Sequence, residues 1–199
     1  MRRRAAQPLS GYEVLLGVTG SIACYKSADL ASKLVQAGAG VTVAMTASAE
    51  RFIAPLTFQT ICQRPVYYSL WQATEECHSS HISLTELADL LIVAPATANT
   101  LAKMAAGMAD NIVTSLALSA TGECPILVAP AMNSRMWAAR PTRDNLNRLR
   151  SWGVHVVGPQ EGFLACRALG PGRMAEPEQI LAAAREIVLK KRPKGRAGR

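Results

Sequence analysis

Short apolar runs alternate along the chain with longer segments in which apolar residues recur at helical spacing. The runs predict strands at residues 14–18, 41–45, 90–94, 126–129 and 154–157. The spacing predicts helices at residues 21–36, 49–63, 99–106, 111–119, 141–152 and 177–189, with the second of them broken at Pro55. Strands and helices therefore follow one another in turn over most of the sequence.

This order predicts an α/β fold, because strand–helix alternation is typical of a parallel sheet with helices on both faces. The strand at residues 90–94 is apolar throughout, as buried parallel strands usually are. We therefore expect a single domain over residues 12–189, a doubly wound parallel sheet of the Rossmann-like or flavodoxin-like type. Residues 1–11 and 190–199 are expected to be basic tails on either side of it.

The charge of the chain changes this picture little. Its 199 residues carry a formal net charge of +8, and nine of the 22 basic residues fall in the two tails, where no acid occurs. The body holds the other thirteen basic residues against fourteen acids, so the basicity is a property of the tails. Solvated tails explain this better than a nucleic-acid interface, and we expect no nucleic-acid partner.

Two classes of protein fit the sequence poorly. No apolar run approaches the ~20 residues that cross a membrane, and no signal-type apolar stretch follows the arginines at residues 2–4, so we expect a cytoplasmic protein without a membrane partner. The cysteines are odd in number and form no Cys-x-x-Cys pair, which argues against a disulfide framework and a structural zinc site. We accordingly expect no metal.

Small and polar residues follow the predicted strands, at the edge of a parallel sheet where ligands usually bind. The first loop, residues 17–23, matches neither the Gly-x-Gly-x-x-Gly dinucleotide fingerprint nor a P-loop. No acid ends the second strand, where an NAD ribose usually needs one, so a mononucleotide phosphate fits better. An ordinary tight turn before a capped helix is the alternative.

Other loop residues also have two interpretations. Asn99 offers donors and an acceptor to a heterocycle such as a flavin, although helix capping by Thr97 or Asn99 is the simpler interpretation. His81, just before a predicted short helix, can act as a base near neutral pH or be an ordinary loop histidine. Cys166 lies in a stretch rich in glycine and proline that predicts a long loop, and a reactive or an inert thiol fits equally.

Several segments, in this order and spacing, resemble the family of homo-oligomeric flavin-containing cysteine decarboxylases over roughly residues 12–189. They are His81 in His-Ile-Ser-Leu, residues 95–100, residues 107–111, residues 130–133 running on through Met136-Trp137, and residues 170–174. Each segment is weak alone, but together they are specific.

The resemblance implies FMN as the cofactor. It assigns the FMN phosphate and ribityl chain to Gly20, Ser21, Ile22, Thr46, Ala47 and Ser48, and the flavin ring to Thr97, Ala98, Asn99, Thr100 and Ala131. It implies His81 and Cys166 as catalytic residues, His81 as acid/base or orienting group and Cys166 as proton donor. Asn133 would hold the substrate carboxylate, and Phe163, Leu164 and Ala165 would belong to a flap over the substrate.

The flap cysteine separates branches of this family. Cys166 favours the redox-neutral branch, which converts 4'-phosphopantothenoyl-L-cysteine to 4'-phosphopantetheine in coenzyme A biosynthesis. Relatives that decarboxylate the C-terminal cysteine of a peptide usually lack it, and prenyl-transferring flavin relatives lack the histidine. A peptidyl-cysteine decarboxylase and a non-catalytic regulatory flavoprotein remain the alternatives, because the flap commonly reads Cys-Gly-Asp whereas Arg167 and Ala168 follow Cys166 here.

The resemblance also implies partners. Members of the family form homotrimers, sometimes stacked into homododecamers, with FMN at the subunit interface. In many bacteria the domain is fused to a phosphopantothenate–cysteine ligase, so either that ligase is a separate partner or this chain is a fragment of such a bifunctional protein.

Overall fold

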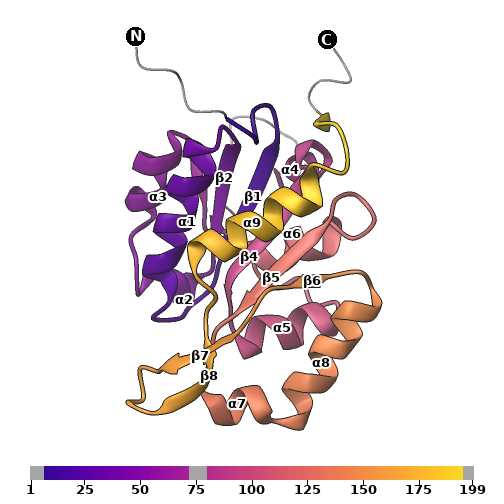
Figure 1. The fold of residues 1–199 in the computed structure, drawn as a ribbon. Helices are drawn as coiled ribbons and strands as arrows, with labels where there is room; N and C mark the ends of the chain where they lie inside the picture. The colour runs from indigo at the N-terminus through magenta and orange to yellow at the C-terminus, as the bar shows by residue number, and fades with distance from the viewer. Residues whose placement is uncertain (1–6, 72–79, 195–199) are drawn as a thin grey trace.

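The computed structural model of the chain describes residues 7–71 and 80–194, without the side chains of Ser80 and His81. At its centre is a six-stranded sheet in which all neighbouring strands are parallel, in the order β3–β2–β1–β4–β5–β6 (Figure 1). The strands are β1 (Glu13–Val18), β2 (Gly40–Met45), β3 (Val66–Tyr67), β4 (Leu90–Ala96), β5 (Ile126–Pro130) and β6 (His155–Val156). The chain order reverses between β1 and β4, and a crevice at the carboxyl ends of these two strands is where such sheets bind ligands.

Helices cover both faces of the sheet, as predicted. One face carries α1 (Cys24–Gln36), α3 (Pro55–Cys62) and α9 (Pro177–Val188). The other carries α4 (Ser80–Leu87), α5 (Ala98–Ala105), α6 (Ile112–Ser119) and α8 (Arg140–Ser151). Two short helices, α2 (Ala47–Glu50) and α7 (Ser134–Ala138), lie near the carboxyl edge.

The alternation of side chains along the central strands builds one core on each face. In β4, Leu90 and Ile92 point into the core beneath α1 and α9, whereas Leu91 and Val93 point into the core beneath α5 and α6. Every residue of β4 is therefore buried, which explains its continuous hydrophobicity. Rigid packing on both faces fixes the strand ends from which the functional loops begin.

Some predicted element ends were wrong, for local reasons. Helix α1 begins at Cys24 rather than residue 21, because the Ser21 hydroxyl accepts a hydrogen bond from Ala23 N and closes a turn before the helix. The predicted break at Pro55 within residues 49–63 is confirmed, because α2 ends at Glu50 and Pro55 is the first residue of α3. Strand β4 continues through Pro95, where its register with β5 shifts.

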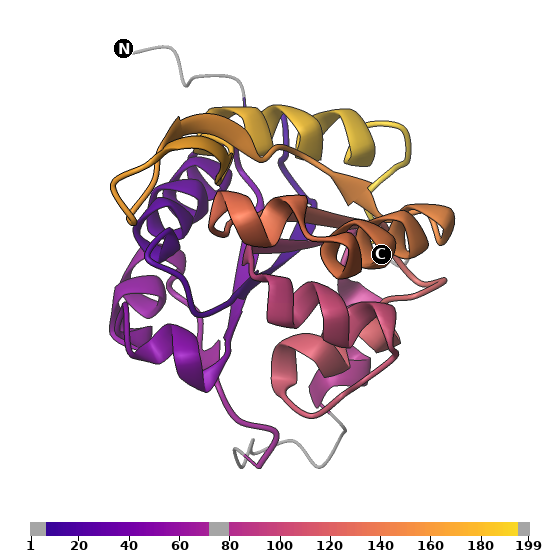
Figure 2. The same cartoon turned by 90° about the horizontal axis from the view of Figure 1, so that it is seen from below.

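The predicted long loop around Cys166 is instead a β-hairpin, which we call the flap. Its strands β7 (Gln160–Phe163) and β8 (Leu169–Arg173) pair antiparallel and extend beyond the carboxyl edge of the sheet (Figures 1 and 2). The prediction failed because three glycines and a proline make this sequence a poor strand former. The pairing, rather than the propensity of its residues, makes the hairpin.

The inner parts of both predicted tails pack against the domain. Leu9 is completely buried, and the Tyr12 hydroxyl donates to the carbonyl of Lys191. Lys194 N donates to Asp89 Oδ1 at 2.8 Å. The folded body therefore extends beyond residues 12–189 at both ends, and the remaining tail residues lie outside the described ranges. None of the described helices has the length and apolar character needed to cross a bilayer.

Candidate functional site

Three loops meet at the crevice between β1 and β4. The buried Thr19 hydroxyl donates to the Pro95 carbonyl at 2.6 Å and accepts from Thr97 N at 3.2 Å, which ties the loop after β1 to the loop after β4. A Cβ on Gly20 would lie 2.4 Å from the Ser48 Cβ, so only glycine lets the loops after β1 and β2 approach so closely. The sequence predicted that these loops converge, but it gave no role to Thr19.

A hollow of about 610 Å³ lies among these loops, and we call it the edge pocket. Its lining residues are Gly20, Ser21, Thr46, Ala47, Ser48, Thr97, Ala98, Asn99, Thr100, Lys103, Asp110, Asn111, Ala131, Met132 and Met136. Every residue predicted to hold the cofactor is among them except Ile22, whose exposed side chain lines the neighbouring groove instead.

The donor groups of the edge pocket fit a phosphorylated mononucleotide. Helix α5 begins here, with Thr97 Oγ1 accepting from Thr100 N, and α2 begins here, with Thr46 Oγ1 accepting from Ala49 N. Helix N-termini and hydroxyl groups together favour phosphate, and the amides of Asn99 and Asn111 can hydrogen-bond a heterocycle. These residues therefore fit FMN by the chemistry of their donors.

The sequence missed several lining residues of this pocket. Lys103 and Asp110 form an ion pair, and the hydrogen bond from Lys103 holds the pKa of the Asp110 carboxyl below its usual value. Asn111 Oδ1 caps α6 by accepting from Val113 N and Thr114 N, both at 3.1 Å. Asn111 lies in one of the resembling segments, which could have identified it, whereas Lys103 reads as an ordinary helix-surface lysine.

A second hollow of about 470 Å³, the flap groove, lies between the start of α1 and the flap. Ser21, Ala131 and Met132 line both the flap groove and the edge pocket, so the two hollows adjoin. All residues predicted for the substrate line the groove, together with Cys166: Asn133, Phe163, Leu164 and Ala165. The structure thus brings the predicted substrate residues and the flap cysteine together.

Asn133 is oriented by the helix that it caps. Its Oδ1 accepts a hydrogen bond of 2.8 Å from Arg135 N at the start of α7. Because Oδ1 faces α7, the amide nitrogen Nδ2 points away from that helix. Nδ2 lies 3.2 Å from Cys166 Sγ. An amide nitrogen and a thiol held side by side provide a donor for a carboxylate next to a group that can give up a proton.

At the flap tip, Arg167 stands in the position of the glycine of the common Cys-Gly-Asp sequence. Arg167 has φ of +62°, in the left-handed region where glycine is favoured. Two hydrogen bonds of 2.9 Å, from Leu164 N to the Ala168 carbonyl and from Arg167 N to the Leu164 carbonyl, hold this turn. The tip therefore keeps a glycine-type turn despite the arginine.

The structure does not describe the side chain of the predicted catalytic histidine. His81 falls in the first turn of α4, rather than before the helix as predicted, and His78 lies outside the described residues. The next residue, Ile82, lines a hollow with residues of α6. Of the described residues that line the edge pocket, none comes from α4.

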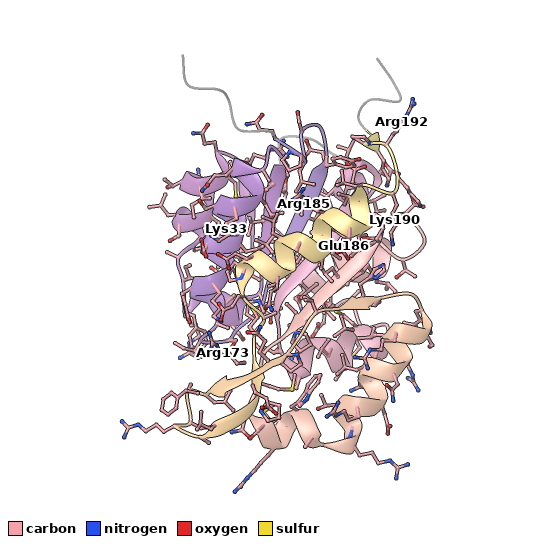
Figure 3. The ribbon with its side chains drawn as sticks, viewed as in Figure 1. Lys33, Arg173, Arg185, Glu186, Lys190 and Arg192 are labelled. Carbon is pink, nitrogen blue, oxygen red and sulfur yellow. The ribbon has the colours of Figure 1, made fainter. Side chains whose placement is uncertain are left out.

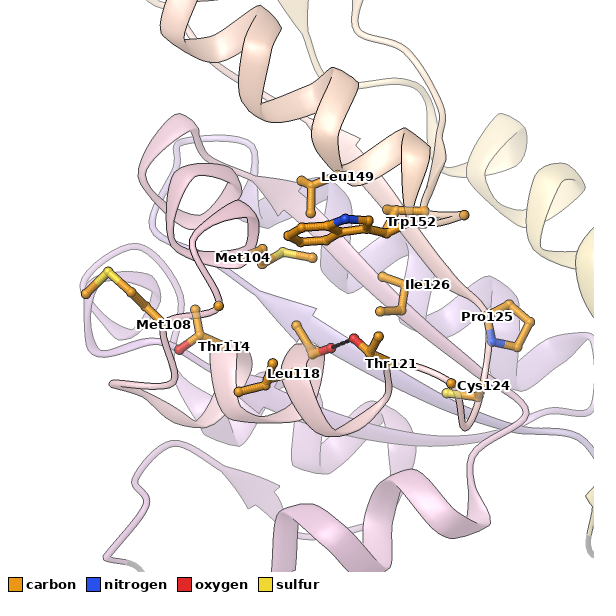
Figure 4. Close-up of a pocket in the computed structure, with 15 residues that line it drawn as sticks. Met104, Met108, Thr114, Leu118, Thr121, Cys124, Pro125, Ile126, Leu149 and Trp152 are labelled. Atoms are coloured by element: carbon orange, nitrogen blue, oxygen red, sulfur yellow. Dashed lines mark hydrogen bonds between the residues drawn. The ribbon is translucent and has the colours of Figure 1, made fainter.

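The cysteines differ in exposure. Cys24 and Cys124 are buried, and burial raises the pKa of both thiols, whereas Cys166 is exposed on the flap. Cys124 contributes to a separate apolar cavity of about 490 Å³ between α6 and α8, which no predicted site residue lines (Figure 4). Within residues 7–71 and 80–194, no group of three His, Cys, Asp or Glu side chains is arranged to bind a metal.

Known proteins resemble this chain along most of its length. The Flavoprotein family model matches residues 2–189. A protein of Streptococcus mutans, described as a probable phosphopantothenoylcysteine decarboxylase, is 43% identical over 169 residues, which cover 85% of this chain and 94% of that protein. The coenzyme A biosynthesis bifunctional protein CoaBC of Vibrio vulnificus is 45% identical over 176 residues, which cover 88% of this chain and 43% of that protein. The chain thus spans less than half the length of such bifunctional relatives.

Solved structures agree with this relationship. A mutant PPC decarboxylase complexed with pantothenoylaminoethenethiol has a TM-score of 0.80 and 33% identity, covering 88% of this chain and 97% of that one. The FMN-dependent cysteine decarboxylase SpaF has a TM-score of 0.79 and 29% identity, and the match covers 92% of this chain and 98% of that chain. The predicted fold and the predicted flavin-binding family are confirmed, and the chain belongs to the flavoprotein family that includes the phosphopantothenoylcysteine decarboxylases.

Proposed function

We propose that the chain is an FMN-dependent carboxy-lyase that converts 4'-phosphopantothenoyl-L-cysteine to 4'-phosphopantetheine in coenzyme A biosynthesis. The observation that carries this proposal is the adjacency of the edge pocket, with its phosphate-type donors, and the flap groove, where Asn133 meets Cys166. The Streptococcus mutans relative, which this chain covers almost completely, supports the substrate.

The roles of the residues follow from the chemistry. Loss of carbon dioxide from a cysteine carboxylate leaves an unstabilised carbanion, so an electron sink is needed. The residues of the edge pocket would hold FMN, which would supply that sink as a reversible hydride acceptor. Asn133 orients the carboxylate through Nδ2, because its Oδ1 is already engaged by α7. Cys166 Sγ donates the proton to the decarboxylated carbon in the reductive half.

We assign His81 as the acid/base or orienting group of the oxidative half, and we propose that a homotrimer brings it to the flavin. Trp71, which is 91% exposed, lines a hollow of about 500 Å³ with Ile82 and Leu118, and such an apolar surface favours a protein contact. Contact between copies through this surface would place α4 of one subunit against another subunit. Light scattering distinguishes a trimer from a monomer and from a stacked dodecamer.

We further propose that the protein acts together with a phosphopantothenate–cysteine ligase and that it works in the cytoplasm. A relative described as a bifunctional protein of coenzyme A biosynthesis supports the first point.

The test combines the visible spectrum of the purified protein with carbon dioxide release and product mass. We expect oxidised-flavin maxima, release of carbon dioxide and formation of 4'-phosphopantetheine. Cys166→Ser should still release carbon dioxide but accumulate an oxidised product, and His81→Asn should keep FMN without turnover. Cys62→Ser, which changes a cysteine outside both hollows, is the matched control.

Other results would redirect the proposal. A yellow protein that acts only on a peptide ending in cysteine would be a peptidyl-cysteine decarboxylase. A yellow protein inert with both substrates would be a regulatory flavoprotein. A colourless protein that cannot be reconstituted with FMN would remove the basis of the proposal.

A further inference from the structure

The segment that follows α9, residues 189–194, turns back across the amino edge of the sheet, at the end of the molecule opposite the flap (Figure 1). We call it the return segment. The Lys191 carbonyl accepts a hydrogen bond of 2.7 Å from the hydroxyl of Tyr12, the residue before β1, and Pro193 is buried. These contacts fix the path of the return segment and bring Lys194 to the end of α4.

The side chain of Lys194 caps α4. Its Nζ donates to the Glu86 carbonyl at 3.1 Å and to the Thr85 carbonyl at 3.4 Å. The last four carbonyls of a helix have no partner within the helix, and the first of these in α4, on Leu84, accepts from Ala88 N at 3.1 Å. Lys194 therefore supplies hydrogen bonds to the next two, and its charge faces the negative end of the helix dipole.

Asp89 fixes the same end of α4 to the sheet. This residue connects α4 to β4 and is 9% exposed. Its Oδ2 accepts from Glu13 N at the start of β1, and its Oδ1 accepts from Lys194 N, both at 2.8 Å. One carboxylate thus joins the sheet, the end of α4 and the return segment, so the backbone of Lys194 is held while its side chain reaches the helix.

Helix α4 is too short to keep its place without such contacts. It has eight residues, whereas isolated helices shorter than about 12 to 15 residues are marginal in water. Thr85 is buried against the domain, but Ile82 and Leu87 are 47% and 63% exposed. The contacts at its ends therefore contribute strongly to where the helix lies, and Lys194 is a described side chain that donates to its C-terminal end.

The helix that Lys194 caps also carries His81, in its first turn. Because a helix forms cooperatively, loosening one end of eight residues affects the other end as well. We propose that Lys194 is a positioning residue, which caps α4 and so holds the helix of His81 where the oxidative half of the reaction needs it. This inference rests on the proposed function and adds a contact between the return segment and the catalytic helix. The competing interpretation gives Lys194 only a contribution to stability.

The test compares two substitutions of Lys194 in the full-length holoenzyme. Lys194→Met keeps the length of the side chain without its charge or donors, and Lys194→Arg keeps both. For Lys194→Met, kcat per bound flavin with 4'-phosphopantothenoylcysteine should fall about 3- to 10-fold, the effect of losing a cation at a helix C-terminus. KM should stay within about twofold, because Lys194 lines neither the flap groove nor the edge pocket. Lys194→Arg should recover most of the loss.

Hydrogen exchange gives a readout that does not depend on turnover. The amides of α4 should exchange about 3- to 10-fold faster in Lys194→Met than in the wild type, because loss of the cap favours local opening of the helix. The amides of α1, on the other face of the sheet, should exchange at the wild-type rate. Lys194→Arg should match the wild type in both helices.

Arg192→Met is the matched control. Arg192 belongs to the same return segment and is exposed beyond the end of α9 (Figure 3). The substitution removes the same charge, but kcat and the exchange of α4 should both stay within about twofold of the wild type, because solvent screens an exposed charge. A comparable loss in this control would overturn the proposal, since the charge of the segment rather than the cap on α4 would then be responsible.

Failure of the positioning role is distinguishable from failure of the proposed function. An unchanged kcat per flavin in Lys194→Met, or an equal loss in Lys194→Arg, would overturn the positioning role even if α4 exchanged faster. If the wild-type holoenzyme releases no carbon dioxide, the proposed function fails, and exchange then decides whether Lys194 holds α4. Faster exchange confined to Lys194→Met would support that hold, and unchanged exchange would refute it.

Discussion

The base of the flap offers the sharpest test of the structure, through Gly172→Ala. Gly172 has φ of +135°, in the region that favours glycine, and a Cβ there would lie 2.1 Å from the Met132 carbonyl oxygen. The atoms must therefore separate, which breaks the 2.9 Å hydrogen bond from Met132 N to the Gly172 carbonyl. We expect the substitution to detach the flap from the loop that carries Asn133.

The magnitude follows from two contributions. A side chain at positive φ costs about 1 to 2 kcal/mol, and loss of the hydrogen bond costs about 1 kcal/mol. Together they favour the detached flap by about 2 to 3 kcal/mol, which corresponds to about 30- to 150-fold in the ratio of docked to detached flap. Turnover that requires the docked flap should fall by a similar factor.

Two measurements report whether the flap is docked, and a third reports whether the edge pocket is intact. Decarboxylation of 4'-phosphopantothenoylcysteine reports the docked state, and tryptic cleavage after the exposed Arg167 reports detachment. The visible flavin spectrum should persist, because no residue of the flap lines the edge pocket.

Gly170→Ala provides the control two residues earlier in the same strand. A Cβ there would meet Ser134 Cβ at 3.4 Å, an ordinary contact, so turnover and cleavage should stay near wild type. If Gly172→Ala also matched wild type in both assays, the close approach of β8 to Met132 would be refuted.

Three further predictions test other parts of the site. Gly20→Ala would place a Cβ 2.4 Å from Ser48 Cβ, so FMN should bind about 10- to 100-fold more weakly, and full retention of colour through gel filtration would contradict this. Thr19→Val removes a buried hydroxyl with two hydrogen-bond partners and should lower the free energy of unfolding by about 1 to 3 kcal/mol in urea, whereas an unchanged midpoint would refute that contribution. Iodoacetamide at about pH 8 should modify Cys166 well before Cys62, because burial raises the pKa of the Cys62 thiol to about 11; similar rates in peptide mass spectrometry would disprove the difference.

The strands and their loops were predictable because local pattern and tertiary environment agree. Strand β4 is apolar at successive positions since helices bury both of its faces, and Thr97 and Asn111 precede their helices because their side chains cap them. The loops that line the edge pocket could be located since each follows a strand of a parallel sheet. Resemblance then supplied FMN and the substrate, which pattern alone left open.

Other features depend on contacts between distant residues. The flap is a hairpin because β7 and β8 pair with each other, although glycine and proline disfavour strands locally. Arg167 occupies a turn that its own residue type disfavours, since hydrogen bonds across the flap tip hold it there. Sequence reasoning treats such residues singly and so predicts a loop.

The sequence by itself determined the α/β class, the family and the loops that form the edge pocket, because hydrophobic period and short motifs are local properties of the chain. Only the tertiary structure decided that Thr19 joins two loops, that Asn133 meets Cys166, and that Lys26 and Arg173 share one carboxylate. Lys26 and Glu176 are 150 positions apart, and no local signal records that the fold buries them together. Burial and pairing of distant charges arise from packing, and therefore appear only once the chain has folded.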